Sequence, residues 1–304
     1  MATSLWRQRM AVVALTGLAL LGIATAAEQD KPPFYEFSHG GKTVYLLGSI
    51  HLGSNDFYPL PSQIEQAFTR AKVLVVEADV GGASADVQAL LGKYGLGTET
   101  PDPKTAAVLN AYCRSRQQVC AALAPFAPWL QASQITVVQF AAMGFSPEAG
   151  VDVTLLERAR GSKRILELEG VEYQFRLMSS LQASHQWAMV REAIEVKDAD
   201  INKLVESWRR GELESLAQLM RESMEEGEDL TLLKILLWDR NYRMADTLMA
   251  MLEQPDMPDT LMVVVGAGHL VGEHSLTAIL AGRRLAIRSS LGHCGEADHI
   301  CHFD

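Results

Sequence analysis

Two apolar stretches near opposite ends of the chain end in the same short pattern of glycine and histidine. Val44–Leu47 is followed by a Gly-Ser-Ile segment and His51, and Leu261–Val265 is followed by Gly-Ala-Gly and His269. Apolar runs of this length, rich in valine and leucine and ended by glycine, predict buried strands. Each histidine then follows the carboxyl end of its strand, where ligands bind in open α/β sheets. We therefore expect the two strands to be parallel neighbours and His51 and His269 to share one site.

A third apolar run leads directly into a carboxylate. Val73–Val76 is followed by Glu77, and an amphipathic helix pattern begins at Ser62, upstream of this run. Ser62 is expected to be the N-cap of that helix, with Glu65 completing a capping box. A strand, a helix and a second strand predict a right-handed crossover and a parallel pair. Glu77 should therefore lie at the same edge of the sheet as His51.

The remaining pattern puts strands at both ends of the chain and helices between them. Further strands are predicted over 34–38, 43–47, 164–168 and 284–288, the first two joined by a glycine-rich turn. Helices are predicted over about 84–150 (interrupted by prolines), 151–160, 171–254 and 273–281. The fold class is therefore α/β, with a central mixed or parallel sheet built from N- and C-terminal strand–helix–strand units. Residues 27–304 are expected to form a single domain with a helical insertion or cap over about 84–255.

The first 26 residues are typical of a signal peptide, and the alternative is an uncleaved membrane anchor. Arg7 and Arg9 precede the apolar stretch Met10–Ile23, which is short for a membrane span, and a small-residue cleavage site ends at Ala26. No later segment has the apolar length of a span. We therefore expect the mature protein to be extracytoplasmic, periplasmic or secreted, after Sec-type cleavage and without a membrane span.

The four cysteines form two pairs with equal spacing. Cys113 and Cys120 are seven apart, as are Cys294 and Cys301. In an exported protein two local disulfides are the simplest interpretation. Seven residues of straight helix span about 10.5 Å, whereas a disulfide needs Cα atoms within about 7 Å, so a bend or two short helices should separate Cys113 from Cys120. Histidines in the tail 293–302 leave a zinc site as the alternative for the second pair.

Charge and missing motifs exclude several classes of function. The formal net charge is −10 and no basic stripe is visible, which argues against a nucleic-acid partner. Hydrophobic residues make up 48% of the chain and charged residues 21%, which is ordinary for a soluble globular protein. The chain has no Gly-x-Ser-x-Gly elbow and no His-Glu-x-x-His helix, so a serine α/β-hydrolase or a conventional zincin is not supported.

The candidate chemistry centres on His51, Glu77 and His269. Two imidazoles and a carboxylate are a usual ligand set for Zn²⁺, Mn²⁺, Co²⁺ or Fe²⁺, and such an ion activates water and polarises a carbonyl. Without a metal, Glu77 and a histidine can still run general acid–base chemistry on water. The structural alternative is that Glu77 serves as a helix cap or in a salt bridge.

Other polar residues are candidates for supporting roles. Arg240 and Asn241 interrupt an apolar helix pattern, and the arginine can clamp an oxyanion or a carboxylate or form an ordinary surface pair. Asp152 and Glu169 are expected to act as caps or salt-bridge partners. His274 is expected to be solvated.

These motifs together resemble the TraB/GumN (TraB–PrgY–GumN) family, whose animal relatives include the secreted Tiki proteases. The matching segments are Leu47-Gly48-Ser49-Ile50-His51, Val75-Val76-Glu77-Ala78-Asp79, Gly150-Val151-Asp152, Leu168-Glu169 with Gln174, Asp239-Arg240-Asn241 and Gly266-Ala267-Gly268-His269-Leu270. The family usually has glutamate where this chain has Asp239.

The resemblance implies an α/β fold shared distantly with erythromycin esterases and ChaN haem-binding proteins. In the Tiki branch it implies divalent-metal-dependent peptidase activity, which places His51, Glu77 and His269 at the metal and catalytic site and Arg240 beside them. The expected function is thus an exported metal-dependent hydrolase, a peptidase acting on a peptide or a small amide or ester with Mn, Co or Zn. The alternatives are a metal-independent esterase-like hydrolase and a non-catalytic peptide- or haem-binding protein.

Overall fold

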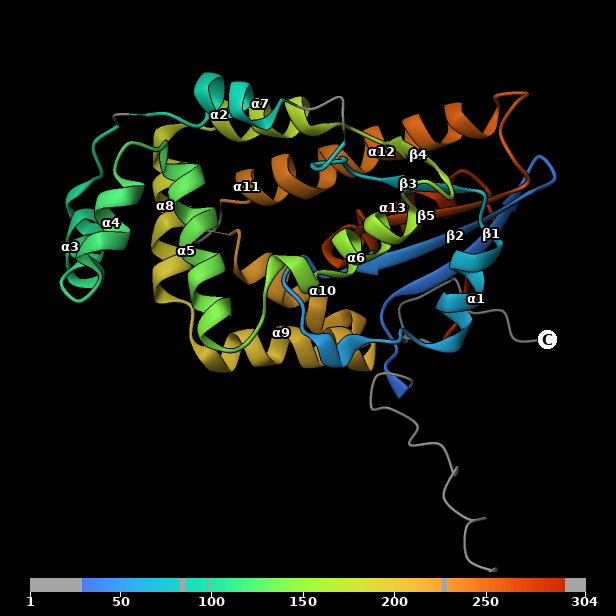
Figure 1. Cartoon of the computed structure of the whole chain (residues 1–304), viewed down its shortest axis with the longest axis horizontal. Helices are drawn as coiled ribbons and strands as arrows, with labels where there is room; N and C mark the ends of the chain where they lie inside the picture. Colours follow the sequence, from blue (N-terminus) through green and yellow to red (C-terminus); the bar gives the residue numbers. More distant parts are fainter. Residues whose placement is uncertain (1–28, 83–85, 98, 226–228, 293–304) are drawn as a thin grey trace, which may run out of the picture.

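The structure, a computed structural model, describes residues 29–82, 86–97, 99–225 and 229–292. Within these residues the strands form one six-stranded mixed sheet, in the order β4-β3-β5-β2-β1-β6 (Figure 1). The strands are β1 (Phe34–His39), β2 (Lys42–Ser49), β3 (Val73–Val76), β4 (Arg164–Glu167), β5 (Thr260–Gly266) and β6 (Arg288–Ser289). The predicted α/β class is confirmed.

The pairing of three strands brings the predicted motifs to one edge of the sheet. β2 and β5 are parallel, with Ser49 opposite Gly266 at their carboxyl ends. β3 is parallel to β5 on its other side, with Val76 opposite Val264. The two strands that precede the histidines are therefore parallel neighbours, as predicted, and β3 delivers Glu77 beside them.

Both faces of the sheet are covered, which explains why its central strands are apolar throughout. Successive side chains of a strand point to opposite faces. Tyr45 and Leu47 of β2 accordingly belong to a different core cluster from Val44 and Leu46. Helices α1 (Ser62–Arg70) and α6 (Val151–Ala159) pack in the first cluster, and α12 (Asp239–Leu252) and α13 (Leu276–Gly282) in the second.

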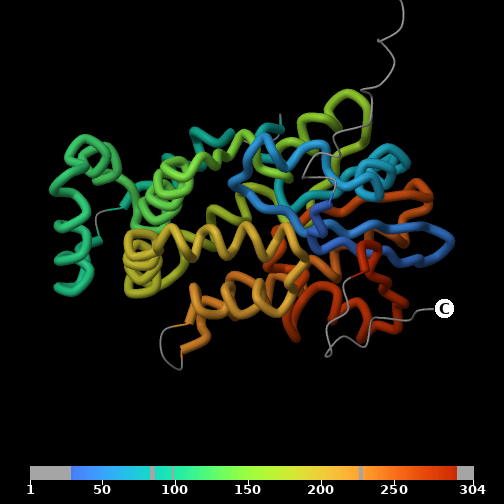
Figure 2. Tube along the Cα trace, turned by 90° about the horizontal axis from the view of Figure 1, so that it is seen from below, coloured from blue at the N-terminus to red at the C-terminus, as the bar shows by residue number. Residues whose placement is uncertain are grey.

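The other helices form a helical body that extends away from the sheet. They are α2 (Val87–Tyr94), α3 (Pro103–Cys113), α4 (Gln117–Leu123), α5 (Pro128–Ala142), α7 (Val171–Ser180), α8 (Ala183–Glu195), α9 (Asp198–Arg210), α10 (Leu213–Glu222) and α11 (Thr231–Leu233). Of these, α9 and α10 also pack in the first cluster, through Val205, Trp208 and Leu216. Short 3-10 turns η2 (Asn55–Phe57), η3 (Pro147–Ala149) and η5 (Ala267–Leu270) and a π-helical segment, η4 (Lys234–Trp238), complete the elements. Figures 1 and 2 show α3, α4, α5 and α8 at the end of the molecule opposite the β1–β2 hairpin.

One contact ties this helical body to the strand that carries His51. Trp208 of α9 is fully buried, and its Nε1 donates to the carbonyl oxygen of Gly48 at 2.9 Å. None of the helices in the described segments is both long and apolar enough to cross a membrane. The predicted domain boundaries stay a prediction.

The Cys113–Cys120 disulfide is present, with its Cα atoms 5.8 Å apart. α3 ends at Cys113 and α4 begins at Gln117, so two short helices meet at a bend as the spacing predicted. Cys294 and Cys301, and the predicted signal peptide over 1–26, lie outside the described residues.

The predicted capping box is wrong. α1 begins at Ser62 itself, Pro61 occupies the N-cap position, and no side chain caps the first turn. Glu65 is instead drawn into a tertiary contact, because its carboxylate accepts from the backbone N–H of Leu60 at 3.2 Å and from the guanidinium of Arg158 at 2.6 Å.

The predicted strand 284–288 is also wrong for most of its length, since β6 is limited to Arg288–Ser289. The residues after α13 are still hydrogen-bonded to its last turn. Arg284 has a φ of 67° and its N–H donates to the carbonyl oxygen of Ala281, while the Leu285 N–H donates to the carbonyl oxygen of Leu280. Backbone groups used in this way are not free to pair with β1. At the other end, α13 begins at Leu276 rather than at 273, because the Ser275 hydroxyl caps it through Ala278 N–H.

Candidate functional site

His51 is held at the end of β2 by α6, the helix that follows α5 and η3 along the chain. α6 starts against this strand, with Val151 N–H donating to the carbonyl oxygen of Ile50 at 3.0 Å. A Cβ on Gly150 would lie 2.4 Å from the His51 carbonyl oxygen, so only glycine permits this approach. Asp152, in the first turn of α6, then contacts His51 Nδ1 through Oδ2 at 3.0 Å. This carboxylate raises the pKa of His51 to about 9, while the imidazole keeps a large exposed surface.

His269 lies in η5, directly after β5, and is buried. Its Nδ1 is 2.6 Å from Oδ1 of Asn241, and Asn241 Nδ2 donates to the carbonyl oxygen of His274 at 2.8 Å. Because the Asn241 amide nitrogen donates to this carbonyl, the Asn241 amide oxygen faces His269 and must accept a hydrogen bond from its Nδ1–H. Nε2 of His269 therefore carries the lone pair. Burial lowers the pKa of His269 to about 4, so the ring is neutral at pH 7.

Glu77 follows β3 and faces His269. Its Oε1 accepts from the Gly266 N–H at 2.6 Å and lies 3.6 Å from His269 Nε2. Its Oε2 accepts from Arg240 at 2.6 Å and from Gln174 at 3.2 Å. Burial raises the pKa of Glu77, but the neighbouring His269, Arg240 and His51 groups and the Gly266 N–H outweigh it and hold that pKa well below its usual range.

Arg240 bridges two buried carboxylates. From α12 it donates to both oxygens of Glu169, at 3.0 Å from Nε to Oε1 and 2.7 Å from Nη2 to Oε2, as well as to Glu77. The Glu169 side chain is fully buried, and Gln174 donates to Glu169 and to Glu77. Arg240 is therefore not an ordinary surface pair but part of a buried ion-pair cluster, and its predicted role in clamping an oxyanion or carboxylate during the reaction stays a prediction. Asp152 and Glu169 are salt-bridge partners, as expected.

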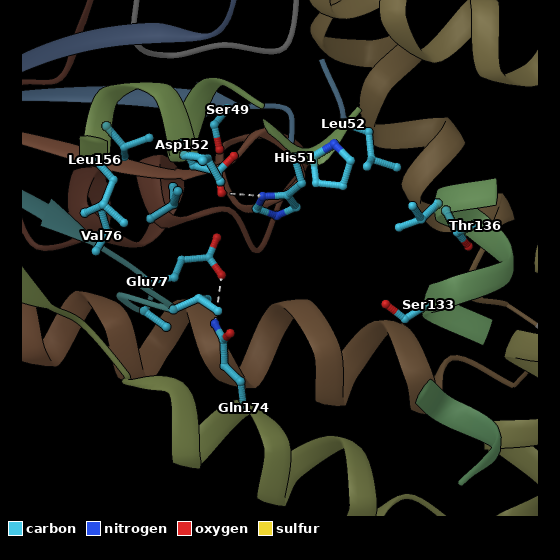
Figure 3. Close-up of a pocket in the computed structure, with 17 residues that line it drawn as sticks. Ser49, His51, Leu52, Val76, Glu77, Ser133, Thr136, Asp152, Leu156 and Gln174 are labelled. Carbon is cyan, nitrogen blue, oxygen red and sulfur yellow. Dashed lines mark hydrogen bonds and ion pairs between the residues drawn. The ribbon is translucent and has the colours of Figure 1, made fainter. Parts of the chain in front are cut away.

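The three predicted site residues converge above Gly266. An ideal Cβ on this glycine would lie 3.2 Å from His51 Nε2, 3.4 Å from Glu77 Oε1 and 3.7 Å from His269 Cδ2. The site opens into a pocket of about 500 Å³. In Figure 3 His51 and Glu77 point toward one another from one side of this pocket, and Ser133 and Thr136 of α5 lie across from them.

The donor set suits a divalent cation in its chemistry. Each imidazole has its Nδ1 held by an oxygen, from Asp152 or from Asn241, which is the usual arrangement around a metal-ligating histidine and leaves Nε2 for the ion. The space over Gly266 that a Cβ would fill is bounded by these atoms. The positions of these side chains fit a metal ion less well than their chemistry does. In the described segments no group of three or more His, Cys, Asp or Glu side chains is placed to hold a metal ion.

Two features of the site were not predicted from the sequence. Ser49 lines the pocket and its Oγ is buried without a hydrogen-bond partner among the described residues; its only signal was its position inside the Gly-x-x-His segment. The hydrogen bond that His269 Nδ1 donates to Asn241 Oδ1 was also missed, although the polar pair at 240–241 within an apolar helix marked the position. His274, expected to be solvated, is 33% exposed and packs against Trp238 with tilted rings whose centroids are 4.2 Å apart.

The fold and the site define an α/β protein with a His–Glu–His cluster at the carboxyl ends of three neighbouring parallel strands. The chain belongs to the TraB/PrgY/gumN family, whose sequence profile matches residues 33–288. It is similar to the uncharacterized protein YbaP of Escherichia coli (strain K12), with 26% identity over 258 residues that cover 79% of this chain and 89% of that protein. YbaP of Shigella flexneri matches with the same identity and coverage. No solved structure matches the chain.

Proposed function

We propose that this protein is a hydrolase that activates water at His51, Glu77 and His269 to cleave an amide bond in a peptide, or a small amide or ester. The observation that carries the proposal is the pairing of His269 Nε2 with Glu77 Oε1, 3.6 Å apart, beside a pocket of about 500 Å³. A neutral imidazole and an anionic carboxylate placed together at strand ends are the groups that water activation needs.

In the leading version, His51, Glu77 and His269 hold a divalent ion, Mn²⁺, Co²⁺ or Zn²⁺. The bound ion would lower the pKa of a water molecule and polarise the substrate carbonyl. The chain's own residues prepare the ligands for this task. Asn241 fixes the tautomer of His269, Asp152 orients His51, and Arg240 keeps Glu77 ionised.

The second version needs no metal and is favoured by a different observation. Arg240 already neutralises Glu77, and Asp152 keeps His51 protonated at neutral pH. His269 Nε2 would then accept a proton from the attacking water, and the His51 imidazolium would donate one to the leaving nitrogen or oxygen. Water is added across the bond: the hydroxyl remains on the acyl carbon, the carbon–nitrogen or carbon–oxygen bond breaks, and the leaving group takes the proton.

Metal content decides between these versions. The mature protein, purified without a chelator or a metal-binding tag, is compared with a His51→Ala/His269→Ala variant and with His39→Ala, which removes a histidine at the far end of β1. Near-stoichiometric metal in the wild type and in His39→Ala, lost in the double variant, supports the metal version. Turnover that survives a chelator in metal-free protein supports the second version. A protein that neither holds metal nor hydrolyses esters or amides overturns both.

We also propose that the protein acts outside the cytoplasm. The disulfide between Cys113 and Cys120 supports this proposal, because such bonds persist in oxidising compartments. Cell fractionation followed by N-terminal sequencing tests it. Mature protein that begins at Ala27 in the periplasm or medium is the expected result, and full-length protein in the cytoplasm contradicts it.

A further inference from the structure

The pocket beside His51 and Glu77 has walls of aliphatic side chains. Val76, Val137, Val153 and Leu156 line it, and so does Val80, which is 58% exposed. A ligand that covers these side chains gains the free energy of removing apolar surface from water.

The wall that faces the histidines comes from a helix without charge. α5 is 15 residues long and contains no Asp, Glu, Lys or Arg. It presents Ser133, Thr136 and Val137 to the pocket, opposite His51 and Glu77 (Figure 3). Partly exposed helix faces are normally rich in charged residues. This face offers a substrate only hydroxyl groups and an aliphatic surface.

The charged groups of the pocket are already paired with each other or with neighbours. None of the described residues that line it is a lysine or an arginine, and its carboxylates are Glu77 and Asp152. Glu77 is bound by Arg240 at 2.6 Å and Asp152 by His51 at 3.0 Å. A substrate carboxylate would therefore find no additional cation on these walls, and a substrate ammonium group would find both carboxylates already in ion pairs. Burying either charge without a partner is unfavourable.

Two buried polar atoms on the described residues that line the pocket lack a hydrogen-bond partner. Ser49 Oγ and Asp152 Oδ1 are both buried and have no partner among the described residues. Buried polar atoms in native structures are usually satisfied. Asp152 Oδ1 can only accept, so this atom disfavours a substrate carboxylate, which supplies acceptors only; a substrate ammonium is disfavoured by the aliphatic walls.

We infer that this pocket selects a neutral substrate residue with an apolar side chain next to the scissile amide, and discriminates against acidic and basic residues alike. The inference rests on the proposed hydrolase function for its substrate, but the walls themselves can be tested by binding.

The experiment compares four acetyl-amino-acid 4-nitroanilides that differ only in the side chain: leucine, asparagine, lysine and glutamate. Ketones that carry the same four side chains, with a methylene in place of the amide nitrogen, cannot be hydrolysed and report binding by calorimetry. We expect kcat/KM and affinity to be highest for leucine, ~10-fold lower for its near-isostere asparagine and ~100-fold lower for lysine and glutamate.

Matched variants test whether the named walls cause the preference. Val137→Asp should reduce the advantage of leucine over lysine at least ~10-fold, whereas Val138→Asp, on the next residue of α5 and outside the pocket lining, should leave the order unchanged. Should Val137→Asp fail to fold, Val80→Asp serves the same purpose. Its control is Leu96→Asp, which is also 58% exposed and does not line this pocket.

The outcomes separate this inference from the proposed function. Turnover without a preference for leucine, or with a preference that Val137→Asp and Val80→Asp leave intact, overturns the inference and leaves the hydrolase standing. Tighter binding of the leucine ketone than of the other three, without turnover of any anilide, supports the pocket's selectivity and contradicts hydrolysis of this bond. Neither binding nor turnover of any compound overturns both.

Discussion

Nδ1 of His269 lies 2.6 Å from Oδ1 of Asn241, and this contact decides which ring nitrogen faces Glu77. The amide of Asn241 is itself oriented by the carbonyl oxygen of His274, 2.8 Å from its Nδ2. Both His269 and Asn241 are almost completely buried. Because water does not compete at such a position, the tautomer of the histidine is set by the protein.

Replacing Asn241 should therefore affect both stability and the site. Asn241→Ala leaves a buried Nδ1–H and the His274 carbonyl oxygen without partners, and we expect it to lower the free energy of unfolding by about 1–3 kcal/mol. It should also weaken metal binding or turnover by roughly 10- to 100-fold, the usual effect of losing such a supporting contact. Urea unfolding and metal titration measure the two effects. An Asn241→Ala protein with unchanged tautomer in ¹⁵N NMR spectra would contradict this role.

The pair of His51 and Asp152 should be visible as a pH effect in metal-free protein. Asp152→Asn should lower the pKa of His51 from about 9 toward its usual value of about 6.5. Since the folded pKa is raised, the stabilisation from this pair is complete below about pH 6.5 and is lost as the pH rises through about 9. NMR titration of the His51 ring protons gives the pKa in both proteins. Equal values in wild type and variant would show that the contact is not maintained in solution.

Removing the charge of Arg240 should be strongly destabilising. Arg240→Met leaves Glu77 and Glu169 buried side by side without their cation, and breaking a buried pair in this way costs about 3–5 kcal/mol. Arg243→Met is the matched control, because Arg243 lies one turn further along α12, is exposed, and stacks on Tyr173. Its loss should cost about 1 kcal/mol or less. Chemical denaturation measures the free energy of unfolding of both variants. Similar losses of this free energy in the two would refute the buried ion-pair role of Arg240.

Glu77 makes the stability of the protein sensitive to acid. Its pKa is held below the usual range in the folded state, so its contribution is present at pH values above the unfolded pKa of about 4.3 and is lost as the pH falls further. We expect a Glu77→Gln variant to show a flatter loss of stability between about pH 4 and pH 2 than the wild type. Thermal unfolding across this range provides the measurement, and parallel curves would count against the ionised state of Glu77.

A methyl group at Gly266 should block the site without unfolding the protein. The Cβ of Gly266→Ala would lie 3.2 Å from His51 Nε2 and 3.4 Å from Glu77 Oε1, in the space where the three site residues converge. Gly282→Ala, in α13, is the control because its Cβ meets nothing within 4 Å. We expect the first variant to lose metal binding or turnover at least ~10-fold with a native circular dichroism spectrum, and the second to keep both. Full activity in Gly266→Ala would place the reacting atoms elsewhere.

Much of the sheet was readable from the sequence, because its signals are local. Val44–Leu47, Val73–Val76 and Leu261–Val265 are continuous apolar runs, and a strand that is buried on both faces has this composition wherever it occurs. The crossover rule correctly made β2 and β3 parallel, but the direct pair that it predicted is wrong, because β5 lies between them. The spacing of Cys113 and Cys120, tested against helix rise, predicted the bend between α3 and α4 that the structure shows.

The errors arose where another contact uses the groups that the predicted local structure needs. Ser62 and Glu65 have the sequence of a capping box, but Glu65 is taken by Arg158 from α6, which lies beside it only in the folded protein. Residues 284–287 are apolar enough for a strand, yet the backbone of Arg284 and Leu285 is still bonded to the end of α13.

The sequence by itself determined that His51, Glu77 and His269 follow the carboxyl ends of buried strands, because apolar runs and glycine stops act over a few residues. The tertiary structure alone decided that β5 lies between β3 and β2, and that Arg240, Asn241 and Asp152 reach the three site residues from helices far away in the chain. It also decided that the uncharged face of α5 closes the opposite side of the pocket. Such contacts depend on how helices pack against one another, and packing is a property of whole surfaces that no short stretch of sequence specifies.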